Sequence, residues 1–228
     1  MDNREIANKA ENRVVQKFPE RIVYLNELLK KPEFCIPEID LKCNLELSTV
    51  LKLGKNINNC DGKNRSESFD SKSYDATPEK PLIPTNKNVI KAFEIIKPNV
   101  QQLIEDTNAL KMWVSLLIPK IEDGNNFGVS VQEDTLAQIQ HVEGEATSFL
   151  EQESHYYVVR AKLVTKILKN PYIEDYRRAI NELDERTYLN MALTVREIRN
   201  HYSTMHDIVI KNFDKIKKPR SYNTDSFY

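Results

Sequence analysis

Glycine is so scarce in this chain that the sequence is poorly suited to a sheet-rich fold. Only 5 of its 228 residues are glycine, and residues 172–218 contain neither glycine nor proline. Short strands joined by tight turns need frequent glycine and proline, whereas long helices need neither. The sequence therefore predicts an all-α fold.

Apolar residues recur at steps of three and four along four segments, which is the pattern of amphipathic helices. The predicted helices cover residues 2–31, 88–118, 130–169 and 174–218. Each of the last two has about 40 residues and a predicted length of about 60 Å. Four long helices with mostly short connections predict an up-down four-helix bundle, and their wide apolar arcs predict burial against neighbouring subunits.

A few residues set the predicted boundaries and kinks. Pro19 and Pro98 lie inside the first two helices and predict kinks, because proline lacks an amide donor. Ser130 and Glu133 form a capping-box pattern, which predicts that the third helix starts at Ser130. Pro171 is predicted to begin the fourth helix.

The chain is predicted to be a single domain with one long polar interruption. Residues 1–53 form an N-terminal helix and a connection, and residues 86–228 carry the other three helices. Residues 54–85 are rich in Asn, Ser, Asp, Lys and Pro. Such a segment buries too little apolar surface to offset its ordering entropy, so we expect a mobile polar loop.

Composition excludes several classes of partner and compartment. The formal net charge of −1 predicts neither a nucleic-acid nor a membrane partner. No apolar run approaches the ~20 residues that span a bilayer, and the polar residues 1–5 predict no signal peptide. The three cysteines, Cys35, Cys43 and Cys60, include no CxxC pair and predict a reducing compartment. We therefore expect a soluble intracellular protein.

No set of residues has the spacing of a known catalytic or metal-binding motif. Helical bundles bind di-iron centres through Glu-x-x-His motifs. Three positions before the four histidines stand Gln138, Gln152, Ile198 and Ser203, so no such motif exists. The cysteines have no histidine nearby in sequence, and no glycine-rich phosphate loop is present. We expect no enzyme activity, no metal and no cofactor.

The segment 119–128 is longer than a connection between two helices requires. It contains two acidic residues, two adjacent amides, one aromatic residue and two of the five glycines. On these residues alone, a shaped contact loop and a long hairpin turn are equally supported.

Most of this segment lies within a longer sequence motif. The run IPKIEDGNNFGVSVQE, residues 118–133, resembles the activation loop of the 11S (REG) proteasome activators. The run EIRNHYSTMHDIVIKNFDKIKKPR, residues 197–220, is similar to the last helix of the same family, and RAKLVTKI and EDYRRAINELDE match it in order and spacing. The stretches KMWVSLLIP, YYVVRAKLV and KKPRSYN, with Tyr228 at the end, are most similar to the gamma-type subunit, which forms homo-heptamers.

The resemblance implies a ring-forming, ATP-independent activator that binds the end of the 20S proteasome and stimulates peptide hydrolysis. It assigns contact with the proteasome gate to a loop, with Asn125 as its central position: Lys120, Ile121, Glu122, Asp123, Gly124, Asn125, Asn126, Phe127 and Gly128. It assigns binding between the proteasome α-subunits to a tail ending in Ser226, Phe227 and Tyr228, and it places Lys162 on the channel of the ring.

The same resemblance implies a location in the nucleus, the cytoplasm or both, with the nucleus favoured by the gamma-type similarity, although no dense basic targeting run is present. The competing interpretation is a non-enzymatic, oligomeric helical scaffold in which the loop is inert.

Overall fold

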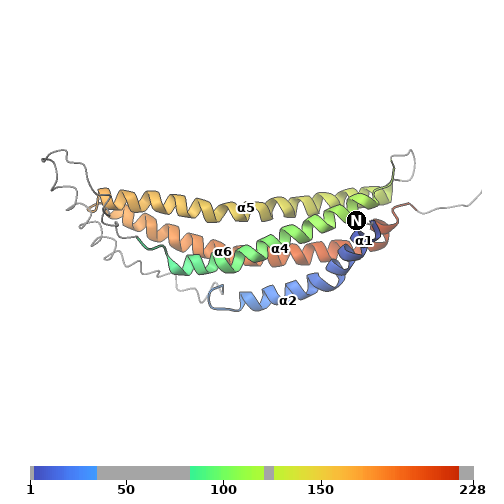
Figure 1. The fold of residues 1–228 in the computed structure, drawn as a ribbon, viewed down its shortest axis with the longest axis horizontal. Helices are drawn as coiled ribbons and strands as arrows, with labels where there is room; N and C mark the ends of the chain where they lie inside the picture. Colours follow the sequence, from blue (N-terminus) through green and yellow to red (C-terminus); the bar gives the residue numbers. More distant parts are fainter. Residues whose placement is uncertain (1–2, 35–82, 121–125, 221–228) are drawn as a thin grey trace, which may run out of the picture. The chain divides into compact units, whose positions relative to one another are not determined.

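The computed structural model describes residues 3–34, 83–120 and 126–220 (Figure 1). Every regular element in these ranges is helical, in agreement with the predicted all-α fold. The elements are α1 (Asn3–Asn12), the π-helical turn η1 (Arg13–Lys17), α2 (Phe18–Leu29), α4 (Lys87–Leu117), α5 (Phe127–Lys169), α6 (Glu174–Lys211) and α7 (Phe213–Lys217).

The kink predicted at Pro19 takes the form of a π-helical turn. The ring of Pro19 would clash with the carbonyl of residue 15 in a regular α-helix, and Pro19 has no amide hydrogen to donate. The wider turn η1 precedes it, and α2 begins at Phe18 with the proline in its first turn. The chain changes direction between α1 and α2 (Figure 1).

The helix starts predicted at Ser130 and at Pro171 are each wrong by about one turn. Helix α5 starts at Phe127, because the amide of Ser130 already donates a helical hydrogen bond of 2.9 Å to the carbonyl of Asn126. Ser130 is therefore inside the helix and does not cap it. Pro171 lies in a turn closed by the Ile173 amide on the Asn170 carbonyl, 3.3 Å away, so α6 starts only at Glu174.

The last predicted helix is divided at Asn212. Both the backbone amide and the side-chain amide of Asn212 donate to the carbonyl of Ile208, at 3.2 and 2.9 Å. This local side-chain bond competes with a continued helix, as is usual for asparagine. The short helix α7 follows and ends before Pro219, as predicted.

The chain divides into two compact units. Unit 1 comprises Met1–Ile39, Ala92–Ser154 and Leu189–Tyr228, and unit 2 comprises Asp40–Lys91 and His155–Tyr188. Helices α4, α5 and α6 each contribute residues to both units.

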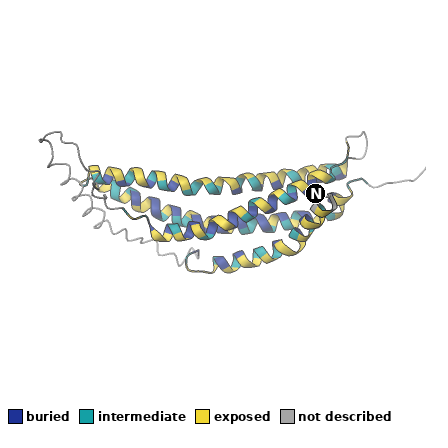
Figure 2. Cartoon of the chain, viewed as in Figure 1, coloured by how far each residue is buried: buried dark blue, intermediate teal, exposed yellow. Residues whose placement is uncertain are grey.

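Unit 1 contains the predicted bundle of four helical segments. The buried stripes of α2, α4, α5 and α6 supply its core, and Figure 2 shows them as bands along each helix. The ring of Phe18 packs edge-on against the ring of Tyr202, with centroids 5.0 Å apart. Fully buried members of this core include Val14, Phe18, Leu103, Leu110, Trp113, Ile139, Ala146, Ala192, Ile198 and Tyr202.

A buried carboxylate joins three helical segments of unit 1. Asp106 on α4 is 3% exposed. Its Oδ1 accepts hydrogen bonds from Arg13 Nη1 at 2.7 Å and from Gln102 Nε2 at 3.1 Å, and its Oδ2 accepts one from the Tyr202 hydroxyl at 2.8 Å. Burial, and then the Asp106 carboxylate, raise the pKa of Tyr202, so its hydroxyl remains a donor.

Unit 2 repeats this arrangement around Asp184 on α6. Asp184 Oδ1 accepts a hydrogen bond of 2.9 Å from the Tyr156 hydroxyl, and Oδ2 accepts one of 3.0 Å from Asn86 Nδ2. Arg160 Nε lies 3.4 Å from Oδ1 and supplies the opposite charge. A small apolar cluster of Val164, Ile167 and Ile180 completes the core of this unit.

Replacing Asp106 by alanine should lower the free energy of unfolding by about 3 kcal/mol, because it leaves the buried Tyr202 hydroxyl without its acceptor and removes the ion pair with Arg13. Chemical denaturation at fixed protein concentration measures this loss. The control is Asp207→Asn, which removes only an exposed ion pair with Lys211 and should change stability by less than about 0.5 kcal/mol. Equal effects of the two substitutions would contradict the structural role of Asp106.

Candidate functional site

At the candidate site, the buried side-chain amide of Gln132 connects three helices of unit 1. Gln132 on α5 is fully buried. Its Nε2 donates to the carbonyl of Leu117, the last residue of α4, at 3.0 Å and to the carbonyl of Ile216 on α7 at 2.7 Å. Carbonyls in the last turn of a helix have no amide partner within that helix. A single side chain therefore caps two helix ends and holds both beside the start of α5.

The first turn of α5 also lies directly against the chain that follows α7. A β-carbon at position 128 would lie 2.6 Å from both the Cα and the carbonyl carbon of Pro219, and closer still to the carbonyl oxygen. Only glycine fits here, because a side chain would meet backbone that cannot rotate away. Gly128 thus permits the close approach of α5 to Pro219.

Arg220 connects both ends of the predicted activation loop. Its Nη2 donates to the carbonyl of Lys120 at 3.2 Å and to Oδ1 of Asn126 at 3.1 Å. Lys120 precedes residues 121–125, and Asn126 follows them. Arg220 is also the last described residue before the predicted tail, so the two edges of the loop and the root of the tail share one guanidinium.

Aromatic contacts and one ion pair hold α7 in place. Lys215 Nζ lies 4.6 Å above the ring of Phe127, and Lys217 forms a 3.0 Å ion pair with Glu11 of α1. Phe213 packs against Trp113 of α4, with ring centroids 5.9 Å apart. The basic end of the last helix is therefore engaged within unit 1.

The structure locates some of the predicted site residues and not others. Lys120 and Asn126 are exposed at the loop edges, whereas Phe127 and Gly128 belong to the first turn of α5 and not to the loop. Lys162 lies on an exposed position of α5 in unit 2. The other predicted residues lie outside the described ranges: Ile121, Glu122, Asp123, Gly124, Asn125, Ser226, Phe227 and Tyr228.

Sequence reasoning missed Gln132 and Arg220. Gln132 stands between Ser130 and Glu133 of the capping-box pattern, and Arg220 ends the run 197–220, but neither pattern predicts the contacts that these two side chains make. A polar residue at a buried position of an amphipathic stripe is the one signal that could have identified Gln132.

Comparison with known proteins decides the family. Residues 82–226 match the family described as proteasome activator PA28, C-terminal, and residues 3–49 match proteasome activator PA28, N-terminal. The chain belongs to the PA28 (11S) family of proteasome activators. The predicted family is thus confirmed, together with its consequence that the chain is a non-catalytic regulator.

Individual relatives agree with this membership. Proteasome activator complex subunit 3 of Gallus gallus, a gamma-type subunit, is 42% identical over 234 residues, covering 98% of this chain and 92% of the relative. The solved 11S subunit PA28 of Plasmodium falciparum superposes with a TM-score of 0.72 at 32% identity, covering 96% of this chain and 91% of that one. These matches favour the activator interpretation over the inert scaffold.

A more distant structure shares the fold. PA26 from Trypanosome brucei, solved in complex with the yeast 20S proteasome, matches with a TM-score of 0.55 at 12% identity, covering 78% of this chain and 81% of that one.

Among the described helices of the present chain, none has the length and apolar character needed to cross a membrane.

Gly128→Ala should lower the free energy of unfolding by about 1–3 kcal/mol, because the new methyl group forces α5 away from Pro219. Gly144→Ala is the matched control on the same helix. Its β-carbon meets open space, and replacing a glycine within a helix by alanine should stabilise by about 0.5–1 kcal/mol. Denaturation midpoints of the two variants should therefore move in opposite directions, and a stabilised Gly128→Ala would contradict the close approach.

Proposed function

We propose that this chain forms a closed ring, binds the end of the 20S proteasome through its C-terminal tails and opens the gate through residues 120–128, without ATP. The observation that carries the proposal is the bridge made by Arg220, which joins Lys120 and Asn126 to the root of the tail. Because both recognition segments start from one place on unit 1, a proteasome surface that binds the tail would also meet the loop. The complex between PA26 and the 20S proteasome supports the choice of partner.

The tail is proposed to supply affinity. Residues 221–228 end in Ser226-Phe227-Tyr228, which offers an aromatic side chain and a terminal carboxylate. Capture of a C-terminal carboxylate is a recurring mode of peptide recognition. One short tail would bind weakly, but tails on a ring bind together, and this avidity raises affinity by about 10²–10⁴.

The ring is proposed to be a homo-heptamer, as implied by the gamma-type similarity. Large apolar side chains remain exposed on unit 1 of the single chain, and burying them between subunits would account for them. They include Val15, Val23, Tyr24, Met112, Leu116, Leu193 and Ile210. Within such a ring, exposed Lys162 would face the channel, and we expect the assembly to act in the nucleus, the cytoplasm or both.

The loop is proposed to shift the gate. A ligand changes a conformational equilibrium only through different affinities for the two states. Tail binding alone would therefore leave the gate closed, and contacts from the loop around Asn125 would favour the open arrangement. Affinity and activation should consequently be separable by mutation.

Asn125→Tyr should abolish stimulation of peptide hydrolysis and leave binding to the 20S proteasome intact, since it changes the loop and not the tail. Sedimentation velocity checks the ring, a binding assay with purified 20S proteasome checks the complex, and fluorogenic peptides report hydrolysis. Asn170→Tyr, at an exposed position of the turn between α5 and α6, is the control and should stimulate normally. Normal stimulation by Asn125→Tyr would remove the loop from the mechanism.

Deleting Phe227 and Tyr228 should lower affinity for the 20S proteasome by at least about 100-fold, because the loss is multiplied over all tails of the ring. The ring itself should persist, since these residues are proposed to contact only the proteasome. Asn170→Tyr, which leaves the whole tail unchanged, again serves as the control. Unchanged binding after the deletion would show that the tail is wrongly assigned.

A further inference from the structure

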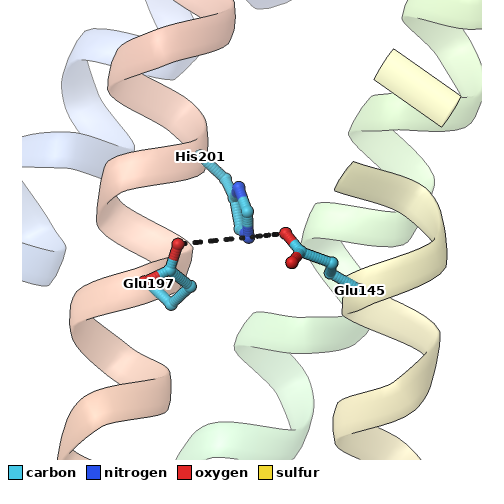
Figure 3. A group of neighbouring side chains, drawn as sticks. All are labelled: Glu145, Glu197 and His201. Carbon is cyan, nitrogen blue, oxygen red and sulfur yellow. Dashed lines mark ion pairs between the residues drawn. The ribbon is translucent and has the colours of Figure 1, made fainter. Parts of the chain in front are cut away.

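A buried histidine of unit 1 points between two glutamates from different helices (Figure 3). His201 on α6 is only 7% exposed. Its Nε2 lies 3.1 Å from Oε2 of Glu145 on α5 and 3.9 Å from Oε1 of Glu197, one turn earlier on α6. The three ligand atoms lie within 4.8 Å of one another.

The histidine nitrogen is not satisfied by these neighbours. His201 Nε2 is buried and makes no hydrogen bond within the described part of the chain. The short distance to Glu145 does not provide one, because a hydrogen bond requires alignment as well as proximity. A buried nitrogen without a partner is unfavourable, so this atom is positioned for a group that the protein does not supply.

The two carboxylates also lack a strong cation. Among the described residues, the ion-pair partners of Glu145 are His141, at 3.5 Å, and His201, and that of Glu197 is His201. Neither carboxylate is paired with a lysine or an arginine among these residues, so the cluster carries negative charge that a bound cation would neutralise.

We propose that His201, Glu145 and Glu197 bind one Zn²⁺ ion. Tetrahedral Zn²⁺ takes imidazole nitrogen and carboxylate oxygen at about 2.0–2.2 Å, which places its ligand atoms about 3.4 Å apart. The distances from His201 Nε2 to the nearest carboxylate oxygens of Glu145 and Glu197, 3.1 and 3.9 Å, lie on either side of this value. Mg²⁺ and Ca²⁺ prefer six or more oxygen ligands, so the nitrogen donor favours zinc.

His141 is the fourth ligand of the proposed site. It lies one turn before Glu145 on α5, and its Nε2 is 3.5 Å from the same carboxylate oxygen that faces His201. Its side chain is 65% exposed and can rotate toward the ion. Each helix would then provide one histidine and one glutamate four residues apart, a spacing that places them on the same face.

The ion would link α5 to α6 at a distance from the loop. Glu145 lies about five turns after the start of α5, so the site is separate from the Gln132 and Arg220 contacts. Its expected effect is to stabilise unit 1, since an ion that binds only the folded chain shifts the folding equilibrium.

The test uses the full-length protein after removal of metal by a chelator. Co²⁺ serves as the spectroscopic probe and should give the visible absorption of a tetrahedral site at about one equivalent per chain, removed by added Zn²⁺. Zn²⁺ should raise the midpoint of thermal unfolding, whereas Mg²⁺ and Ca²⁺ at the same concentration should not. Absence of Co²⁺ and Zn²⁺ binding, or equal stabilisation by Mg²⁺, would overturn the proposal.

Single substitutions test which side chains bind the ion. His201→Gln and Glu197→Gln should each weaken Zn²⁺ binding by at least about 100-fold, because even loss of an outer-sphere partner costs 10–100-fold. Glu197 is half exposed, so its substitution tests the site without disturbing the core. His206→Gln, on the same helix but outside the cluster, should bind as the wild type does. Wild-type affinity in both His201→Gln and Glu197→Gln would contradict the site even if the protein binds zinc elsewhere.

Discussion

The arrangement at the loop end of unit 1 depends on one buried amide. Gln132 caps the last turn of α4 through Leu117 and the last turn of α7 through Ile216. Without this donor, two carbonyls would lose their partner at a cost of about 1–3 kcal/mol each if they stayed buried. Helix α7 has only five residues and cannot be stable by itself, because helix nucleation is unfavourable. The position of the tail root, and with it the proposed approach to a proteasome, therefore follows from contacts made by α5.

Buried carboxylates give the two units a common construction. Asp106 in unit 1 and Asp184 in unit 2 each accept a hydrogen bond from a tyrosine hydroxyl and one from a side-chain amide, and each lies beside an arginine. An apolar stripe alone leaves a helix free to slide or rotate by small steps, whereas a buried charge with fixed donors does not. We infer that these two residues set the register of the helices, including the register that brings Gln132 to Leu117.

Much of the fold was predictable because helices depend on local patterns. Apolar periodicity located the long helices, and the π-helical turn at Arg13–Lys17 fulfils the kink expected from Pro19. The capping box at Ser130 failed because the Ser130 amide already donates to the carbonyl of Asn126, within a helix that starts at Phe127. The cluster around His201 escaped notice for a different reason. Its glutamate stands four residues before it rather than three, and Glu145 joins it only through helix packing.

Hydrolysis of a short fluorogenic peptide by purified latent 20S proteasome tests the central claim most directly. The wild-type chain should be added over a range of concentrations in the absence of ATP, with its oligomeric state verified at each one. A ring that binds and opens the gate predicts a several-fold, saturable increase in the rate of hydrolysis. An unchanged rate at concentrations where the intact ring is shown to bind the 20S proteasome would contradict the account, because binding would then occur without opening the gate.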